Sequence, residues 1–186
     1  FALPELLPII MSLSDEQVKQ ILAKLREDEQ ELVKEFAGKT PTQLQKEADE
    51  NLQEQFDDWL GSVSAEQKVL IHQYNQQRLS TLDMWLEYRH EWLRQFEVAL
   101  GQRADKALLT ERLTLLMTQP DELKSEQHKV FLRKNTEAFG TLLLAMNTSL
   151  TDKQSKHFYK KLGGLIQDLT ELNQEAIEKE ASAKKA

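Results

Sequence analysis

Apolar side chains recur every three or four residues along most of the chain, a spacing that predicts α-helices. The longest such run covers residues 64–100 and contains no glycine or proline. Its apolar positions include Leu79, Leu82, Trp85, Leu86, Trp92, Leu93, Phe96 and Leu100. We therefore predict one long central helix over about residues 65–100, with other helices covering its aromatic face.

Shorter amphipathic runs fill the rest of the chain and are separated by residues typical of helix ends. Gly38, Gly61, Gly101 and Pro120 stand between them. Because the connections are short, successive helices should pack antiparallel. We predict an all-α protein, a bundle of about six main antiparallel helices that forms a single domain over residues 1–175. Residues 176–186 have few apolar side chains left to bury and are expected to fray.

Composition agrees with this fold class and narrows the range of partners. Glu, Gln, Lys and Leu are abundant, whereas Val, Ile and Tyr are scarce, so helix formers are favoured over strand formers. Residues 14–60 carry 13 acidic and 6 basic side chains and account for the whole net charge of −7. A nucleic-acid-binding protein would show a basic stripe instead, so no nucleic-acid partner is expected. Whether the acidic region binds cations or basic peptides stays open.

The residues that usually carry catalysis are absent or isolated. The chain has no cysteine, which excludes a disulfide, a thiol nucleophile and a thiolate metal site. Of the four histidines, only His90 has a suggestive spacing, in Glu87-x-x-His90. A di-iron carboxylate site needs two such motifs and two further glutamates. No phosphate-binding glycine loop or nucleophile elbow occurs. We therefore predict no catalytic residue, no metal and no cofactor, and a protein that is not an enzyme.

Three polar residues interrupt the predicted apolar faces. Arg89 lies at the centre of the aromatic stripe, and Glu29 takes an apolar position in the helix predicted over about residues 14–37. A buried arginine needs a partner. We hypothesise that Glu29 and Arg89 meet inside the bundle, with Asn135 as a third member of a buried polar network that fixes helix register.

The aromatic series Trp85, Tyr88, Trp92 and Phe96 allows two interpretations. Stripes at this spacing usually belong to the core of a helical bundle. The same side chains could instead form an apolar contact face for a protein or a hydrophobic ligand. The sequence leaves both interpretations open.

The clearest internal repetition is a five-residue pattern at three predicted helix starts. It reads Leu13-Ser-Asp-Glu-Gln17, Val63-Ser-Ala-Glu-Gln67 and Leu150-Thr-Asp-Lys-Gln154. In such a capping box the hydroxyl accepts a bond from a free backbone N–H, and the glutamine reaches back to the cap residue. The pattern also resembles the LTxxQ motifs of the Spy/CpxP family of small, helical, cysteine-free periplasmic proteins. This chain is longer, has three boxes and is acidic.

The order of motifs along nearly the whole chain is similar to that of a family of uncharacterised proteobacterial lipoproteins. The motifs are LSDEQ, Trp59-Leu-Gly-Ser-Val-Ser-Ala-Glu-Gln67, Arg89 with Trp92, Arg133-Lys-Asn135 and LTDKQ. This resemblance implies a periplasmic protein, tethered to the outer membrane by a lipid anchor upstream of Phe1 in the full-length precursor. It implies no activity, so it transfers no functional residue.

These observations lead to a non-enzymatic protein-interaction module, chaperone-like or adaptor, with a protein partner that the sequence does not identify. Two alternatives remain. The first is a structural or assembly subunit that docks on a fixed envelope partner. The second is a carrier of a hydrophobic ligand, which requires a lined cavity. The oligomeric state is not indicated.

Overall fold

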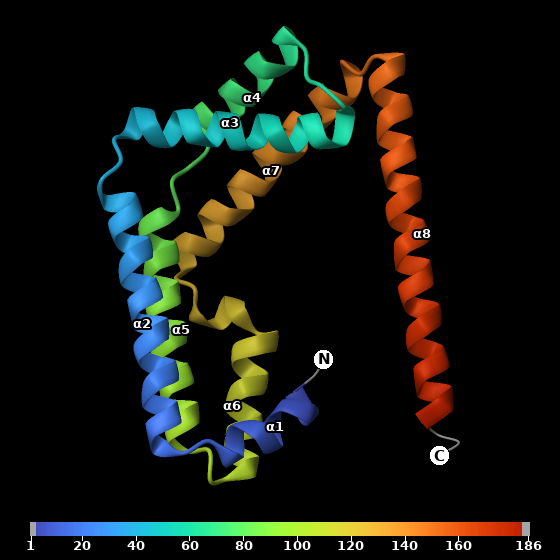
Figure 1. Ribbon diagram of the computed structural model, residues 1–186. Helices are drawn as coiled ribbons and strands as arrows, with labels where there is room; N and C mark the ends of the chain where they lie inside the picture. The colour runs from blue at the N-terminus through green and yellow to red at the C-terminus, as the bar shows by residue number, and fades with distance from the viewer. Residues whose placement is uncertain (1–2, 184–186) are drawn as a thin grey trace. The chain divides into compact units, whose positions relative to one another are not determined.

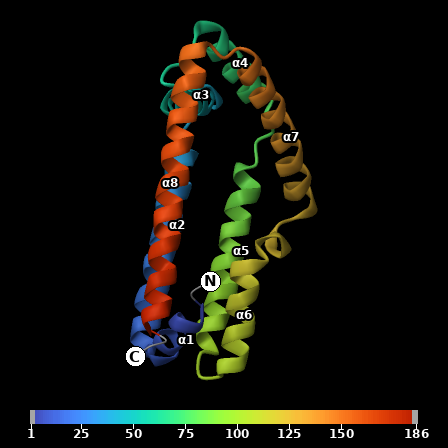
Figure 2. The ribbon, with the colours of Figure 1, turned by 90° about the vertical axis from the view of Figure 1, so that its right-hand side faces the viewer.

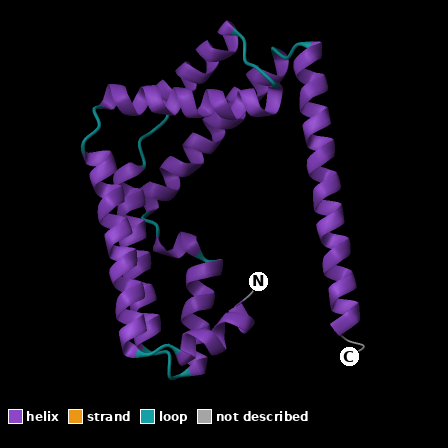
Figure 3. Ribbon diagram, in the orientation of Figure 1, coloured by secondary structure: helices purple, strands orange, loops and turns teal. Residues whose placement is uncertain are grey.

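The structure, a computed structural model, describes residues 3–183, and no strand occurs among them (Figure 3). The predicted all-α class is thus confirmed. The elements are α1 (Leu3–Ser12), α2 (Asp15–Ala37), α3 (Pro41–Leu60), α4 (Ala65–Gln77), α5 (Leu82–Gly101), α6 (Lys106–Thr118), the 3-10 helix η1 (Pro120–Leu123), α7 (Glu126–Thr148) and α8 (Asp152–Ala183). No helix in the described part of the chain is long and apolar enough to cross a membrane.

The contacts divide the chain into two compact units whose segments alternate along the sequence. Unit 1 comprises residues 1–40 and 79–137, and unit 2 comprises residues 41–78 and 138–186. Unit 1 therefore holds α1, α2, α5, α6 and the first half of α7. Unit 2 holds α3, α4, the second half of α7 and α8. The sequence predicts a single domain over residues 1–175, and does not show this division.

The core of unit 1 consists of two apolar clusters that share α5. Figure 1 shows α2 and α5 side by side, and Figure 2 shows α5 beside α6. The first cluster joins α1, α5 and α6 through Leu3, Leu7, Ala99, Leu109, Leu113 and Leu116. The second joins α2 and α5 through Val18, Leu22, Leu93 and Leu100. All of these side chains repeat at helical spacing, so burial follows the predicted faces.

The core of unit 2 is smaller and lies where α3, α4 and the end of α7 meet. Its buried members are Leu60, Ile71, Leu142 and Met146. Phe139 and Tyr74 pack against them, with ring centroids 5.6 Å apart. The first turns of α8 contribute Phe158 to the same cluster.

The long central helix predicted over residues 65–100 is wrong in one respect, since it breaks into α4 and α5. Arg78 ends α4 with an extended backbone, ψ 128°. At Leu79 the Asn135 side chain replaces the missing helical bonds. Its amide nitrogen donates to the Leu79 carbonyl, and its carbonyl oxygen accepts from the Leu79 N–H, both at 2.9 Å. Asparagine can do this because its side chain carries the same donor and acceptor as a peptide group.

The C-terminal end of the chain, predicted to fray over residues 176–186, is helical as far as the structure describes it. Helix α8 continues to Ala183, and residues 184–186 lie outside the described part of the chain. The first turns of α8 pack on unit 2, but the side chains of residues 163–177 are all exposed. The helix therefore carries about four turns of exposed side chains beyond its last packed residues.

Candidate functional site

Two of the three capping boxes meet in unit 2 and bury their glutamines against each other. Gln67 and Gln154 are 0% and 6% exposed. The Gln154 amide nitrogen donates to the Gln67 carbonyl oxygen at 2.8 Å, and Gln67 donates in return at 3.3 Å. Gln154 also donates to the Ser62 carbonyl at 2.7 Å, and Gln67 to the Ser149 hydroxyl at 3.0 Å.

Both glutamines keep their capping role as well, since Gln67 accepts from the Ser64 N–H and Gln154 from the Thr151 N–H, each at 2.9 Å. Every donor and acceptor of the two amides is therefore used, which allows them to be fully buried. This pair locks the start of α4 to the start of α8.

The start of α8 forms one wall of an apolar groove that lies entirely within unit 2. The groove encloses a volume of about 610 Å³ between α3, the end of α7 and the first turns of α8. Its lining includes Leu52, Phe56, Trp59, Phe139, Leu143, Met146, Leu150, Phe158 and Leu162. Polar lining is sparse, with Gln55, Asn147 and Ser155 among its members. A concave apolar surface with few polar groups is typical of a binding site for an apolar ligand or side chains.

Lysine and aromatic side chains shape the edge of this groove. Trp59 packs on Phe158 with ring centroids 5.9 Å apart. The Lys161 ammonium lies 5.2 Å from the Trp59 ring centroid and forms an ion pair with Asp58. These contacts fix the indole on the wall of the groove. Leu143 and Tyr159, which also line the groove, are 45% and 70% exposed, so part of its apolar lining faces solvent.

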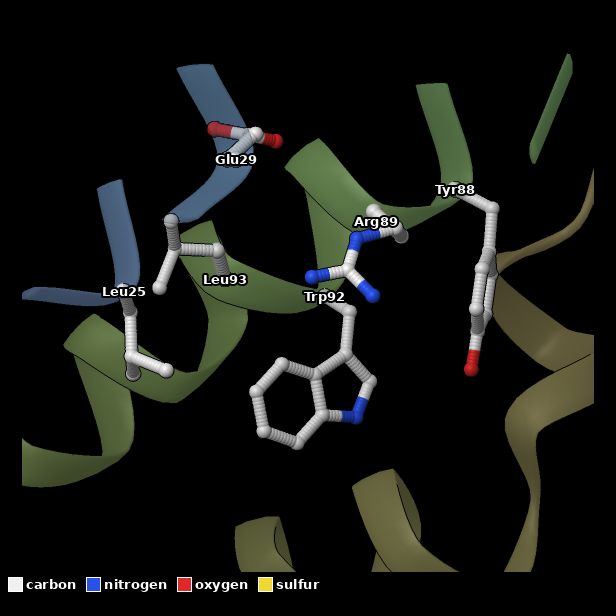
Figure 4. Close-up of a pocket in the computed structure, with 6 residues that line it drawn as sticks. All are labelled: Leu25, Glu29, Tyr88, Arg89, Trp92 and Leu93. Atoms are coloured by element: carbon white, nitrogen blue, oxygen red, sulfur yellow. The ribbon is translucent and has the colours of Figure 1, made fainter. Parts of the chain in front are cut away.

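Unit 1 contains a smaller cavity of about 280 Å³ between α2 and α5. Figure 4 shows its lining residues, which are Leu25, Glu29, Tyr88, Arg89, Trp92 and Leu93. The Arg89 guanidinium carbon lies 5.1 Å from the Trp85 ring centroid, at cation–π distance. The Arg89 Nε atom is buried and has no hydrogen-bond partner.

The hypothesised polar network does not form as one network in the described residues. Glu29 and Arg89 line the same cavity, but the Glu29 carboxylate lies against His90, at 3.6 Å between Oε2 and Nδ1. Arg89 lies against Trp85 instead. Asn135 forms its side-chain hydrogen bonds with the Leu79 backbone. The guanidinium of Arg89 thus contacts the Trp85 ring, whereas the sequence predicted contact with the Glu29 carboxylate.

The four residues of the aromatic series separate into two environments. Trp92 and Phe96 stack with centroids 5.1 Å apart and pack against the core of unit 1. The Trp92 indole N–H donates to the Leu116 carbonyl at 3.4 Å. Tyr88 lines the 280 Å³ cavity with Lys124 5.6 Å from its ring centroid, and Trp85 lies under Arg89. Of the four residues, Tyr88 and Trp92 line the cavity, so one member of each pair borders space that another molecule could enter.

A family of unknown function, DUF6279, matches residues 2–129. The chain belongs to this family. No curated protein matches, and no solved structure matches.

The DUF6279 match includes most of unit 1 but only part of unit 2. It covers α1 to α6 and the first residues of α7. The α3 wall of the 610 Å³ groove lies inside the match, whereas the α7 and α8 walls follow it. The family description names no activity.

Polar clusters elsewhere in this DUF6279 chain serve the fold. His72 Nδ1 lies 2.6 Å from the Asp49 carboxylate, which also accepts from Asn75 and so joins α3 to α4. Burial raises the pKa of Asp49, but the hydrogen bonds from His72, Asn75 and Gln45 outweigh it and leave this pKa below its ordinary value. The second ring nitrogen of His72 faces the Gln76 amide at 2.8 Å. Within the described residues, no group of three or more metal-ligating side chains is arranged to hold a metal ion.

Sequence reasoning missed both the paired glutamines and the groove. The boxes themselves are visible in the sequence, but the pairing joins residues 87 positions apart. The residues that line the groove belong to apolar helix faces that the sequence predicts, but the sequence does not show that unit 2 leaves these faces partly uncovered. An available signal was the apolar face of the last predicted helix, which continues from Phe158 and Leu162 through Leu165, Leu169 and Leu172.

Proposed function

We propose that this protein is a non-enzymatic protein-interaction module whose unit 2 groove holds apolar side chains of a partner segment. The observation that carries the proposal is the apolar groove of about 610 Å³, with Leu143 and Tyr159 exposed at its edge. Exposed, contiguous apolar surface on a chain that is otherwise 30% charged usually marks an interaction site. A chaperone-like or adaptor role follows, because the groove offers shape and apolar contact with few groups that would select a sequence.

The proposal also includes the cellular compartment, which is the periplasm. The motif order similar to uncharacterised proteobacterial lipoproteins, and the boxes resembling those of the Spy/CpxP proteins, support a periplasmic protein tethered to the outer membrane. The full precursor sequence tests this directly. A signal peptide that ends at a lipidated cysteine is expected, and a start methionine just before Phe1 would contradict it.

The groove itself is tested with a pair of matched leucines on α7. Leu143 lines the groove and is 45% exposed, whereas the adjacent Leu144 is 72% exposed and is not part of the lining. Neither is in the core, so Leu143→Glu and Leu144→Glu should both fold. The measurement is light scattering of a chemically unfolded client protein with an equimolar amount of each variant.

We expect the wild type and Leu144→Glu to suppress client aggregation, and Leu143→Glu to lose most of this effect because a carboxylate enters the groove. Equal suppression by all three proteins would show that the groove is not the contact surface. Failure of the wild type to suppress at all would contradict a chaperone-like role.

A carrier of a hydrophobic small molecule is the second candidate, and the groove volume favours it. Ligand pockets commonly enclose about 300–1,000 Å³. Displacement of an environment-sensitive apolar dye by a long-chain fatty acid tests this function. One-to-one displacement that Leu143→Glu abolishes would support the carrier, and a dye signal that fatty acid leaves unchanged would exclude it.

A further inference from the structure

Helix α8 carries an apolar stripe that no part of its own unit covers. Leu165, Ile166, Leu169, Leu172 and Ile177 are 43%, 57%, 57%, 62% and 58% exposed. In Figures 1 and 2, no other described element of unit 2 lies beside this half of α8. We call these five residues the α8 stripe. Large apolar side chains at helical spacing over four turns form a face suited to a groove.

The α8 stripe and the groove lie on the same side of α8. Phe158 and Leu162 line the groove, and Leu165, Leu169 and Leu172 continue their alternating steps of three and four residues. That repeat keeps the two groove residues and these three leucines of the α8 stripe on one face of the helix. The two apolar surfaces are therefore neighbours on one chain, although the stripe of a continuous helix cannot reach the groove built on its own first turns. A second molecule is needed to bring them together.

Charge along α8 indicates which second molecule fits. Residues 152–161 carry four lysines and one aspartate, whereas residues 162–177 carry Asp168, Glu171 and Glu175 and no basic residue. Two copies of α8 placed antiparallel bring the basic half of each against the acidic half of the other. A parallel arrangement sets like charges side by side. Exposed ion pairs contribute little to affinity, so the charges select orientation while apolar burial supplies affinity.

We infer that a second copy of this chain occupies the groove, with the α8 stripe of each protomer seated in the groove of the other. The arrangement is isologous: one two-fold axis, near the middle of α8, generates two identical groove–stripe contacts. This inference rests on the proposed function, because it names a partner for the same groove. It adds that dimerisation and client binding compete for one surface.

Sedimentation equilibrium on the full chain tests the dimer with two variants that damage opposite sides of the contact. Leu169→Glu damages the α8 stripe and leaves the groove intact, and Leu143→Glu does the reverse. We expect a wild-type dimer, with each variant raising the dissociation constant at least about tenfold. Leu144→Glu, outside both surfaces, should dimerise like the wild type.

Mixing the two damaged variants makes the test specific. A heterodimer of Leu169→Glu and Leu143→Glu retains one intact groove–stripe contact, whereas either homodimer retains none. The mixture should therefore associate more strongly than each variant alone. No gain on mixing would overturn the reciprocal contact, as would a wild-type protein that stays monomeric at every concentration.

The absence of cysteine allows the orientation to be read by cross-linking. Single cysteines at Leu143 and Leu169 should form a disulfide with each other on mixing, and Ile177→Cys, which lies far from the two-fold axis, should not cross-link to itself efficiently. Strong self-cross-linking at every position tried along α8 would indicate a parallel pair and contradict the inference.

The client assay separates this inference from the proposed function. Leu169→Glu frees the groove, so it should suppress aggregation at least as well as the wild type. Client suppression by a strictly monomeric wild type would reject the dimer and keep the groove as a binding site. If the wild type is a dimer but Leu169→Glu and Leu143→Glu suppress client aggregation equally, the dimer is kept and the groove is rejected as the client-binding site.

Discussion

The same capping box occurs in both units, and its glutamine has a different role in each. In unit 1, Gln17 is exposed and accepts a bond from the Ser14 N–H at 2.9 Å. In unit 2, Gln67 makes the equivalent bond and is also buried against Gln154. Local sequence therefore specifies the helix start, whereas the tertiary partner decides whether that start also joins two helices.

The two units also differ in how they treat buried polar groups. The glutamine pair in unit 2 has every donor and acceptor satisfied and does not titrate. In unit 1, His128 is 2% exposed, and its Nδ1 atom has no hydrogen-bond partner. One unit holds a neutral and complete network, and the other holds an incomplete and titratable group.

Replacing the paired glutamine should cost far more than replacing the exposed one. Gln67→Ala removes the bonds to Gln154 and Ser149 and leaves a buried amide without its partner, a loss of about 3 kcal/mol in unit 2. Gln17→Ala removes one exposed capping bond, about 0.5 kcal/mol. Urea titration followed by amide exchange in α4 and α8 measures both. Equal effects would show that the pairing adds nothing to the cap.

Replacing Asn135 should have the second-largest effect on stability, because its side chain makes two hydrogen bonds to the backbone of Leu79. Asn135→Ala leaves the Leu79 N–H and C=O without partners, and we expect a loss of about 2 kcal/mol together with rapid exchange of the Leu79 amide. Thr136→Ala, at the next and exposed position, is the control and should change stability by less than about 0.5 kcal/mol. A stable Asn135→Ala protein with a protected Leu79 amide would contradict this role.

The glycines that end α2 and α3 offer a third comparison between the units. Gly61 has φ +83°, and a Cβ atom there would lie 3.1 Å from His157 Nδ1. Gly61→Ala should therefore destabilise unit 2 by about 1–2 kcal/mol. Gly38 has φ −84° and open surroundings, so Gly38→Ala should be neutral or slightly stabilising. Thermal melts of the two variants check the difference, and equal shifts would refute it.

Features fixed by neighbours in the chain could be predicted from the sequence, and features fixed by distant contacts could not. The all-helical class and the boxes at Ser14 and Ser64 follow from local spacing and are confirmed. The break before Leu82 depends on a side chain 56 residues away, so periodicity alone predicts one unbroken helix. The groove could not be predicted from the sequence either. It forms where helices of unit 2 leave part of an apolar face uncovered, and a covered and an uncovered apolar face have the same sequence pattern.

The smallest effect at neutral pH, and the one that grows in acid, concerns His128. Burial lowers its pKa, and the nearby Lys124 lowers it further, while Asp121 and Glu87 act in the opposite direction. The unfolded chain therefore takes up a proton near pH 6.5 before the folded one does, and stability falls as the pH drops below that value. His128→Gln should remove this part of the pH dependence while changing little at pH 7. Urea midpoints of both proteins across the acidic range test the sign, with amide exchange assigning the loss to unit 1. Neither Gln67 nor Gln154 titrates, and the Asp49 carboxylate affects stability only near and below its ordinary pKa of 3.8, so opening of unit 2 should not share this slope between about pH 5 and 6.5. A wild type and a His128→Gln variant with parallel pH profiles would show that the buried imidazole is not the source of the contrast.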